Sequence, residues 1–178
     1  MRTRKHTQAI QIVTLVLVLA VLGCRHSSST VLPFRVTPVE KKDIVVEDGD
    51  TFLWKGQRVR MLGIDCAETN SPYHKGNQDP WGTLAEDYLR EQIKYAKQLS
   101  MIRIEQSDRY GRWLAYLLAD GENVNAKIIQ VGLAYETVTH YGKQGLDKYA
   151  EECLEAAKTA PKPEFENPAE FRKRNRKN

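Results

Sequence analysis

A series of short β-branched runs separated by tight-turn signals constrains this chain more than any other feature. The runs occupy residues 44–47, 51–55 and 58–64. Asp48-Gly49 separates the first two runs, and Gly56-Gln57 separates the last two. Glycine-containing dipeptides between strand-forming segments are typical of β-hairpins. The sequence therefore predicts three antiparallel strands joined by two tight turns.

The pattern changes to helical spacing after a polar loop over residues 69–82. Thr83 followed by Glu86 matches a capping box, which predicts a helix that begins there and runs to about Gln98. The remaining segments predict two strands, at 101–105 and 113–118, and two helices, at 124–131 and 146–158.

This order of elements favours one α+β architecture. Three strands, a helix and two closing strands follow the order of the five-stranded Greek-key barrel called the OB-fold. We therefore expect a five-stranded Greek-key OB-fold barrel with a helix between strands 3 and 4 and further helices at the C-terminus. A chain of 178 residues has room for one such domain with a leader and a tail.

The composition divides the chain into four segments. Residues 1–23 are expected to be a signal peptide of the lipoprotein type, and residues 24–40 a tether. Residues 41–160 are the expected OB-fold domain, and residues 161–178 a Pro-rich and then basic tail. Two interpretations of the tail stay open, a solvated flexible segment or an arm that binds nucleic acid or anionic lipid.

The leader begins with basic residues and continues with an apolar run over 12–22, which is shorter than the ~20 residues of a membrane-spanning helix. It ends in Val21-Leu22-Gly23-Cys24, which resembles the lipobox of bacterial lipoproteins, in which the cysteine is lipidated. We expect export and anchoring to a membrane of the cell envelope through a lipid on Cys24. The alternative is an ordinary cleaved signal, an unmodified Cys24 and a secreted protein.

The overall composition excludes several classes of protein. A hydrophobic share of 41% excludes a disordered chain, and three cysteines are too few for a disulfide-rich scaffold. The formal net charge is only +4, and much of the positive charge lies at the two ends of the chain. Affinity for nucleic acid therefore has to come from a local site and not from overall basicity. The sequence has neither the Cys/His spacing of a zinc site nor a glycine-rich phosphate loop.

Three charged clusters are candidates for a functional site, at residues 47–51, 60–68 and 108–112. Each one alone is explained by a turn or a solvated loop. Together they put Asp50 at the start of one strand and Asp65 at the end of another, with Arg60 on an apolar strand face. An arginine in that position needs an anionic partner, because an unpaired buried charge is costly. Carboxylate oxygens in such a site suit Ca²⁺ or Mg²⁺ better than zinc.

A succession of motifs runs along residues 43–158. It consists of Asp48-Gly-Asp-Thr51, Val59-Arg-Met-Leu-Gly-Ile-Asp65-x-x-Glu68, Asp108-Arg-Tyr-Gly-Arg112-x-Leu-Ala-Tyr116, Asp120-Gly-x-x-Val-Asn125 and Gly132-Leu-Ala134. This succession resembles the staphylococcal nuclease (thermonuclease) family. The resemblance implies an OB barrel and a calcium-dependent enzyme that hydrolyses phosphodiester bonds of DNA and RNA, leaving 3′-phosphate products. We expect a monomer with no obligate protein partner.

The resemblance also implies a calcium site. Its ligands would be the carboxylates of Asp50 and Asp65 and the backbone carbonyl of Cys66. Calcium bound there would neutralise phosphate charge and make a water molecule more acidic.

The remaining roles implied by the resemblance concern the substrate. Arg60 and Arg112 would each bind phosphate oxygens through a forked guanidinium, and Glu68 would act as the general base. Arg109 and Tyr110 would bind a further phosphate of the nucleic acid.

Two other function classes remain possible at this stage. One is a catalytically silent OB-fold module that binds nucleic acid or a protein partner, and the other is an envelope scaffold. Silent members of the family lose the site's carboxylates or arginines, whereas this chain keeps both. A nuclease assay with calcium and then with a chelator separates these classes.

Two local features stay open as well. Cys66 is either a small buried packing residue, a reactive thiol or the disulfide partner of Cys153. Residues 73–75 follow Glu68 and either reach the substrate or form an ordinary exposed loop.

Overall fold

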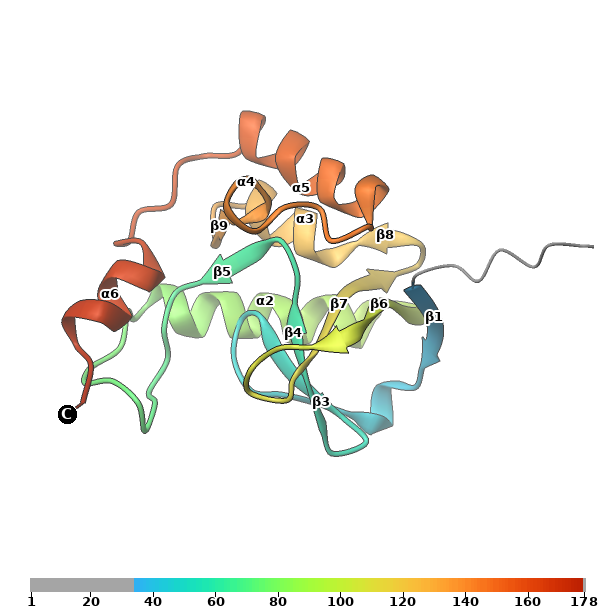
Figure 1. The fold of residues 1–178 in the computed structure, drawn as a ribbon, viewed down its shortest axis with the longest axis horizontal. Helices are drawn as coiled ribbons and strands as arrows, with labels where there is room; N and C mark the ends of the chain where they lie inside the picture. Colours follow the sequence, from blue (N-terminus) through green and yellow to red (C-terminus); the bar gives the residue numbers. More distant parts are fainter. Residues whose placement is uncertain (1–33, 178) are drawn as a thin grey trace, which may run out of the picture. The chain divides into compact units, whose positions relative to one another are not determined.

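The computed structural model describes residues 34–177 (Figure 1). The expected signal peptide, Cys24 and most of the expected tether lie outside these residues. The strands are β1 (Phe34–Val39), β2 (Ile44–Val46), β3 (Thr51–Trp54), β4 (Gln57–Met61), β5 (Ile64–Cys66), β6 (Leu99–Ser107), β7 (Trp113–Ala119), β8 (Glu122–Asn123) and β9 (Ala134–Glu136). The helices are η1 (Lys41–Asp43), α2 (Trp81–Tyr95), α3 (Val124–Gln130), α4 (Val138–Tyr141), α5 (Asp147–Thr159) and α6 (Pro168–Arg174).

The main sheet is mixed and curls into a partial barrel. Its strand order is β1-β6-β7-β4-β3-β2, with β8 attached to β7. Strands β4 and β7 run parallel, whereas the other neighbours in the sheet run antiparallel. Strands β5 and β9 form a separate antiparallel pair. The expected α+β fold of the OB type, with a helix between the third and fourth predicted strands, is confirmed.

The three predicted antiparallel strands are present, but the third one is broken. Strand β4 ends at Met61 and β5 begins at Ile64. Gly63 lies between them with φ 76°, and a Cβ atom there would come within 3.1 Å of the Tyr116 hydroxyl. The buried positions shift from Val59 and Met61 to Ile64 across this bend, whereas the sequence has apolar residues on both sides of it and so gives no sign of the shift. The bend lets Asp65 return towards Arg60.

Strand β1 occupies residues that the sequence analysis assigned to the tether. It pairs antiparallel with β6, from Phe34 opposite Ile104 to Val39 opposite Leu99. Strand β6 is also longer than the expected 101–105. Pairing with β1 satisfies backbone groups that would otherwise form an open sheet edge.

Helix α2 starts earlier than the predicted capping box, so that prediction is wrong. The helix begins at Trp81, and the Leu84 amide already donates to the Pro80 carbonyl at 2.9 Å. Thr83 therefore lies inside the first turn, where its hydroxyl donates to Asp79 Oδ1 at 2.9 Å. The end of the helix at Tyr95 is followed by Ala96 in an extended conformation.

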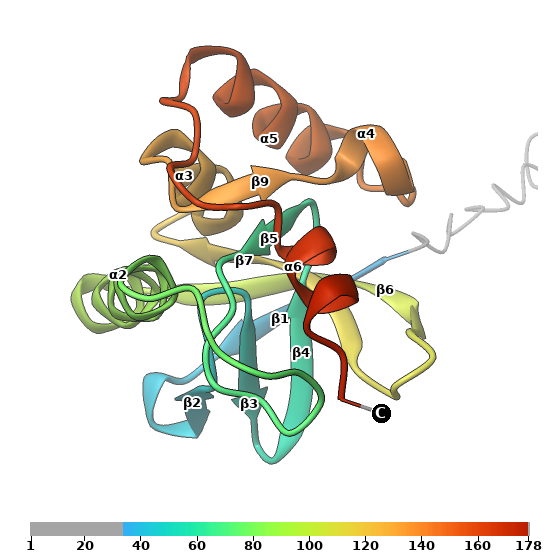
Figure 2. The same cartoon turned by 90° about the vertical axis from the view of Figure 1, so that its left-hand side faces the viewer.

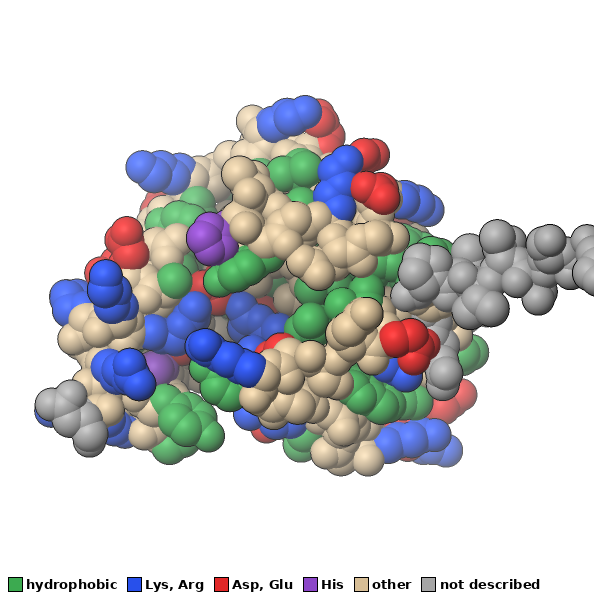
Figure 3. Space-filling view, in the orientation of Figure 1, with side chains coloured by type: hydrophobic (Ala, Val, Ile, Leu, Met, Phe, Trp, Pro, Cys, Tyr) green, Lys and Arg blue, Asp and Glu red, His purple; other side chains and the backbone are tan. Residues whose placement is uncertain are grey.

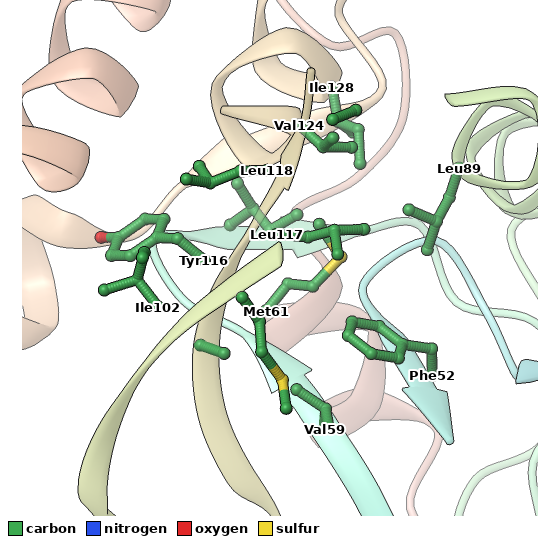
Figure 4. Close-up of a cluster of buried hydrophobic side chains, with 14 of the residues drawn as sticks. Phe52, Val59, Met61, Leu89, Ile102, Tyr116, Leu117, Leu118, Val124 and Ile128 are labelled. Atoms are coloured by element: carbon green, nitrogen blue, oxygen red, sulfur yellow. The ribbon is translucent and has the colours of Figure 1, made fainter. Parts of the chain in front are cut away.

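A hydrophobic core fills the space between the sheet and helices α2 and α3 (Figure 4). Its most deeply buried members come from strands and helices alike: Phe52, Val59, Met61, Leu89, Leu117, Val124 and Ile128. Each large apolar side chain buried in this way stabilises the fold by roughly 1.5–3 kcal/mol. The core makes the barrel a firm support for polar side chains at its rim.

The segment after α5 is not a free tail. Helix α6 lies beside β5 and beside the loop that follows it (Figures 1 and 2). Phe165 and Phe171 from this segment are buried, 7% and 8% exposed. Neither interpretation left open by the sequence, a solvated segment or an arm, describes this packing. Across residues 34–177, no helix has the length and apolar character needed to cross a membrane.

Candidate active site

Strands β3, β4 and β5 bring two acids and one arginine together. Asp50 directly precedes β3, Arg60 lies opposite Thr51 in the β3–β4 pair, and Asp65 is the central residue of β5. The Arg60 guanidinium donates through Nη1 to Asp50 Oδ1 and through Nη2 to Asp65 Oδ1, the latter at 2.6 Å. The predicted need of Arg60 for an anionic partner is therefore met twice.

The two acids differ in how well their charge is balanced. Asp50 and Asp65 are only 2% and 5% exposed. Burial raises the pKa of Asp50 to about 7, although the positive charge of Arg60 partly opposes this shift. Burial also acts to raise the pKa of Asp65, but Arg60 and Arg172 together outweigh it and lower that pKa. Asp65 thus carries a stable negative charge, whereas the charge of Asp50 lacks full compensation.

Cys66 contributes to the site through its backbone. Its amide donates to Asp50 Oδ2 at 2.8 Å, which fixes the second oxygen of that carboxylate. The Cys66 thiol is buried, and burial raises its pKa. Cys66 and Cys153 are both free thiols. Of the three interpretations, the packing role agrees with the structure, and a disulfide between these cysteines does not.

The backbone of Glu68 is clamped by residues from the following loop. The Glu68 amide donates to Gln78 Oε1 at 3.0 Å, and the Gln78 amide donates to the Glu68 carbonyl at 2.8 Å. Gly82, in the first turn of α2, approaches the same carbonyl so closely that a Cβ atom would lie 2.9 Å from its oxygen. Any residue larger than glycine at this position would therefore displace Glu68 or the helix.

The side chain of Glu68 contacts a buried histidine. His74 is 3% exposed, and its Nε2 lies 2.8 Å from Glu68 Oε2. Its Nδ1 lies 3.2 Å from the Gly76 carbonyl oxygen. The loop at 73–75 is thus divided, because His74 turns inward while Tyr73 is 76% exposed.

Arg172 is an unexpected member of the site. It projects from α6 and donates to Asp65 through Nη2 at 2.9 Å and through Nη1 at 3.1 Å. The same Nη1 donates to Glu68 Oε1. The sequence separates these partners by more than a hundred residues, and Arg172 looks like its basic neighbours there. The available signal was Asn167-Pro168, a helix-start pattern in which the Asn167 side chain accepts from the Ala169 amide at 3.0 Å.

The third predicted cluster forms a group of its own at the β6–β7 turn. Arg112 Nε donates to Asp108 Oδ2 at 2.8 Å, and Arg109 Nη2 donates to the Tyr110 hydroxyl at 2.7 Å. Tyr110 is 66% exposed. In the described part of the chain, Arg112 forms its ion pair with Asp108 and not with Asp65 or the other site carboxylates. Figure 3 shows Lys and Arg side chains over α6 and across the middle of this face, with acidic side chains among them.

The chemistry of these residues fits a hard divalent cation. Within residues 34–177, no three Asp, Glu, His or Cys side chains gather in an arrangement that could hold a metal ion. The predicted set is smaller, since it contains two carboxylates and one backbone carbonyl. Both carboxylates are buried, and Asp50 lacks full charge compensation, so an added cation would relieve its burial cost.

Comparison with known proteins agrees with this combination of an OB-type barrel and an acidic, arginine-containing site. The family model described as "Staphylococcal nuclease homologue" matches residues 58–164. The chain therefore belongs to the family of staphylococcal nuclease homologues.

Three curated relatives illustrate the similarity. A protein named thermonuclease from Staphylococcus hyicus is 36% identical over 97 residues, which is 52% of this chain and 56% of the relative. Endonuclease YncB from Bacillus subtilis (strain 168) is 35% identical over 104 residues, or 53% of this chain and 48% of the relative. A thermonuclease from Staphylococcus intermedius is 32% identical over 93 residues, or 50% of this chain and 54% of the relative. The matched region thus spans about half the length of these relatives.

Proposed function

We propose that this chain is a calcium-dependent nuclease that hydrolyses phosphodiester bonds of DNA and RNA. The observation that carries the proposal is the half-buried Arg60 between the buried Asp50 and Asp65, with Glu68 joined to Asp65 through Arg172. Membership of the nuclease family and relatives named thermonuclease and endonuclease support it.

Asp50, Asp65 and the carbonyl of Cys66 would hold the calcium ion. Bound there, calcium would supply charge neutralisation for a phosphate and increase the acidity of a water molecule. The burial of both carboxylates in the barrel rim keeps their orientation fixed before any ligand arrives. A site that is ordered in advance loses less free energy on binding.

Arg60 and Arg112 would bind the scissile phosphate from two structural elements. Each guanidinium can donate two parallel hydrogen bonds to phosphate oxygens, and these bonds strengthen as negative charge grows in the transition state. Arg60 now donates to acids, and Arg112 to Asp108, so a phosphate would share or replace those partners. The exposed Arg109 and Tyr110 would contact a neighbouring phosphate.

Glu68 would accept the proton of the attacking water or orient that water. Its backbone is fixed by Gln78, and its Oε2 is held by His74, so its position is well defined. Attack with departure of the 5′-oxygen would leave products that end in a 3′-phosphate.

We also propose that the nuclease acts outside the cytosol, attached to the envelope through Cys24. The lipobox-like Val21-Leu22-Gly23-Cys24 supports this placement. A lipoprotein carries more than one lipid chain, and one chain alone anchors only marginally. Because Cys24 is the residue proposed to carry these chains, replacing it with Ser should move the full-length protein from the membrane fraction to the soluble fraction or stall its processing. Soluble unaltered protein with an unmodified Cys24 would disprove the anchor.

A fluorescence-quenched single-stranded DNA oligonucleotide tests the activity. The full chain should cleave it with calcium, stop when a chelator is added, and resume when calcium is restored. Mass spectrometry of the fragments should find 3′-phosphate ends. Undiminished cleavage in the chelator would exclude the calcium requirement, and 3′-hydroxyl ends would exclude the proposed chemistry.

A further inference from the structure

The C-terminal segment from Phe165 to Lys177, here called the strap, covers one side of the candidate site. Several contacts attach it to the loop after Glu68. The Lys75 amide donates to the Asn175 carbonyl at 2.8 Å, and the Lys177 amide donates to the Tyr73 carbonyl at 3.1 Å. The Phe171 ring meets the edge of the buried His74 ring at 5.6 Å between centroids.

Arg172 uses this attachment to occupy the carboxylates of the site. Asp65 Oδ1 accepts from Arg60 and Arg172, and Asp65 Oδ2 accepts from Arg172. Glu68 Oε1 accepts from Arg172, while His74 lies at Oε2. Every side-chain oxygen of Asp65 and Glu68 therefore has a partner from a basic side chain.

We propose that Arg172 is a tethered competitor of the divalent cation, and that cation binding releases the strap from Asp65 and Glu68. This inference rests on the proposed function, because it takes Asp65 as a cation ligand. Arg172 occupies both oxygens of Asp65, whereas Arg60 occupies only Oδ1. A cation ligated by Oδ2 can leave Arg60 in place, but it repels Arg172 and needs its position. The cation and Arg172 therefore bind Asp65 in exchange for each other.

The strap is short and partly exposed, as expected of a segment that can detach. Helix α6 has seven residues, and the Arg172 side chain is 38% exposed. The strap is joined to the loop at 73–78, including a 2.7 Å bond from Gln78 Nε2 to the Glu166 carbonyl, and at its start the Phe165 carbonyl accepts from the Tyr135 hydroxyl at 2.6 Å. Short surface segments open locally at a fraction of the free energy of global unfolding. Release of the strap would uncover Glu68 at the moment when the cation is in place.

Linkage makes the competition reciprocal and therefore measurable without catalysis. If the strap weakens cation binding, removal of its positive charge must strengthen that binding by the same free energy. Isothermal titration calorimetry with calcium and the full chain compares the unaltered protein with Arg172→Gln. The matched control is Lys173→Gln, which removes the same charge from an exposed neighbour in α6.

Arg172→Gln should bind calcium roughly tenfold more tightly or better, and Lys173→Gln should stay within about twofold of the unaltered chain. Unchanged or weaker calcium binding by Arg172→Gln would overturn the inference. That result together with a lower kcat would instead indicate that Arg172 remains in the site and binds substrate phosphate.

Hydrogen exchange provides a second test that needs no variant. Amides of residues 168–177 in the unaltered chain should exchange faster with saturating calcium than with a chelator, whereas amides of β6 and β7 should not. Equal or slower exchange in residues 168–177 would contradict release of the strap. If the chain neither binds calcium nor cleaves the oligonucleotide, the proposed function itself is refuted. If the chain does both, but neither the calorimetry nor the hydrogen exchange shows the expected change, only the competition between Arg172 and the cation is refuted.

Discussion

Two regions of the molecule supply positive charge to the acids of the site and share Asp65, and they are built very differently. Strands β3 to β5 place Arg60 between Asp50 and Asp65 inside a sheet whose register is fixed by hairpin pairing. The strap brings Arg172 to Asp65 and Glu68 from the far end of the chain, through a short helix on the surface. The strand region has the hydrophobic core behind it, whereas the strap lies on the surface against the loop at 73–78 and, through Phe165, against Tyr135 and Trp81.

This difference separates a permanent component of the site from a removable one. The backbone of Arg60 cannot move away from the two acids without breaking the β3–β4 pair. Arg172 can leave by local opening, after which the strand region keeps its geometry. Changes in the strand region should therefore affect catalysis and global stability, while changes in the strap should affect cation binding and local dynamics.

The largest effect is expected from Arg60→Lys. Lysine keeps the charge but cannot donate a forked pair of bonds, so kcat should fall by about 10³-fold or more with a smaller change in KM. Arg58→Lys is the matched control, because Arg58 lies in the same strand but is exposed and pairs with Glu47. Steady-state kinetics on one oligonucleotide would contradict the role of Arg60 if both variants lost activity equally.

Glu68→Gln should have the next largest effect. Glutamine keeps the shape of the side chain but cannot accept a proton from water, so kcat should fall by at least about 10²-fold. Glu170→Gln, in the strap, offers a control that leaves the site's acids intact. A kcat for Glu68→Gln within tenfold of the unaltered value would remove Glu68 from the reaction.

Asp50→Asn should stabilise the chelator-treated protein. Burial raises the pKa of Asp50 from 3.8 to about 7, so the folded state holds a proton that the unfolded state has already lost. Between these two values the ionisation of Asp50 makes the folded state less stable as the pH rises. The variant should gain roughly 1–3 kcal/mol near neutral pH, and the gain should shrink towards pH ~4.

Urea denaturation of both proteins across this pH range measures that difference. A stability difference that does not change with pH, or a less stable variant near neutral pH, would show that burial does not raise the pKa of Asp50. The same variant should bind calcium more weakly, because it lacks one of the two predicted carboxylate ligands.

The smallest global effect is expected from Phe171→Ala. Loss of this ring removes the contact with His74, so α6 should open locally while the barrel keeps its stability within about 1 kcal/mol. Hydrogen exchange should accelerate in residues 168–177 and at the Lys75 amide that bonds to Asn175, but not in the barrel strands. Equal acceleration in β6 and β7 would mean that the strap and the barrel unfold as one unit.

The sequence predicted the strand region better than the strap for a physical reason. The turns at 48–49 and 56–57 and the alternation of β3 and β4 are local signals, and they already place Asp50 near Arg60. The bend at Gly63 could not be predicted, because apolar residues continue on both sides of it in the sequence. The alternation pattern carries no information about a crowded contact with Tyr116.

The partners of Glu68 could not be predicted because they depend on tertiary packing. His74 and Gln78 occur in a polar loop that looks exposed, yet both are buried in the fold, where Phe171 packs against His74 and Gln78 bonds to the Glu166 carbonyl. Arg172 occurs in a basic run where each residue looks equivalent. The Asn167-Pro168 helix start was readable, but it carries no information about which surface the helix meets.

The central claim is that Asp50 and Asp65 hold the cation needed for cleavage. The most direct test is the initial rate of oligonucleotide cleavage as a function of calcium concentration for the unaltered chain, Asp65→Asn and the exposed control Asp87→Asn. Asp65→Asn should need at least roughly tenfold more calcium for half-maximal rate, since a ligand carboxylate is lost, and Asp87→Asn should match the unaltered chain. The same calcium dependence in all three proteins would contradict the account.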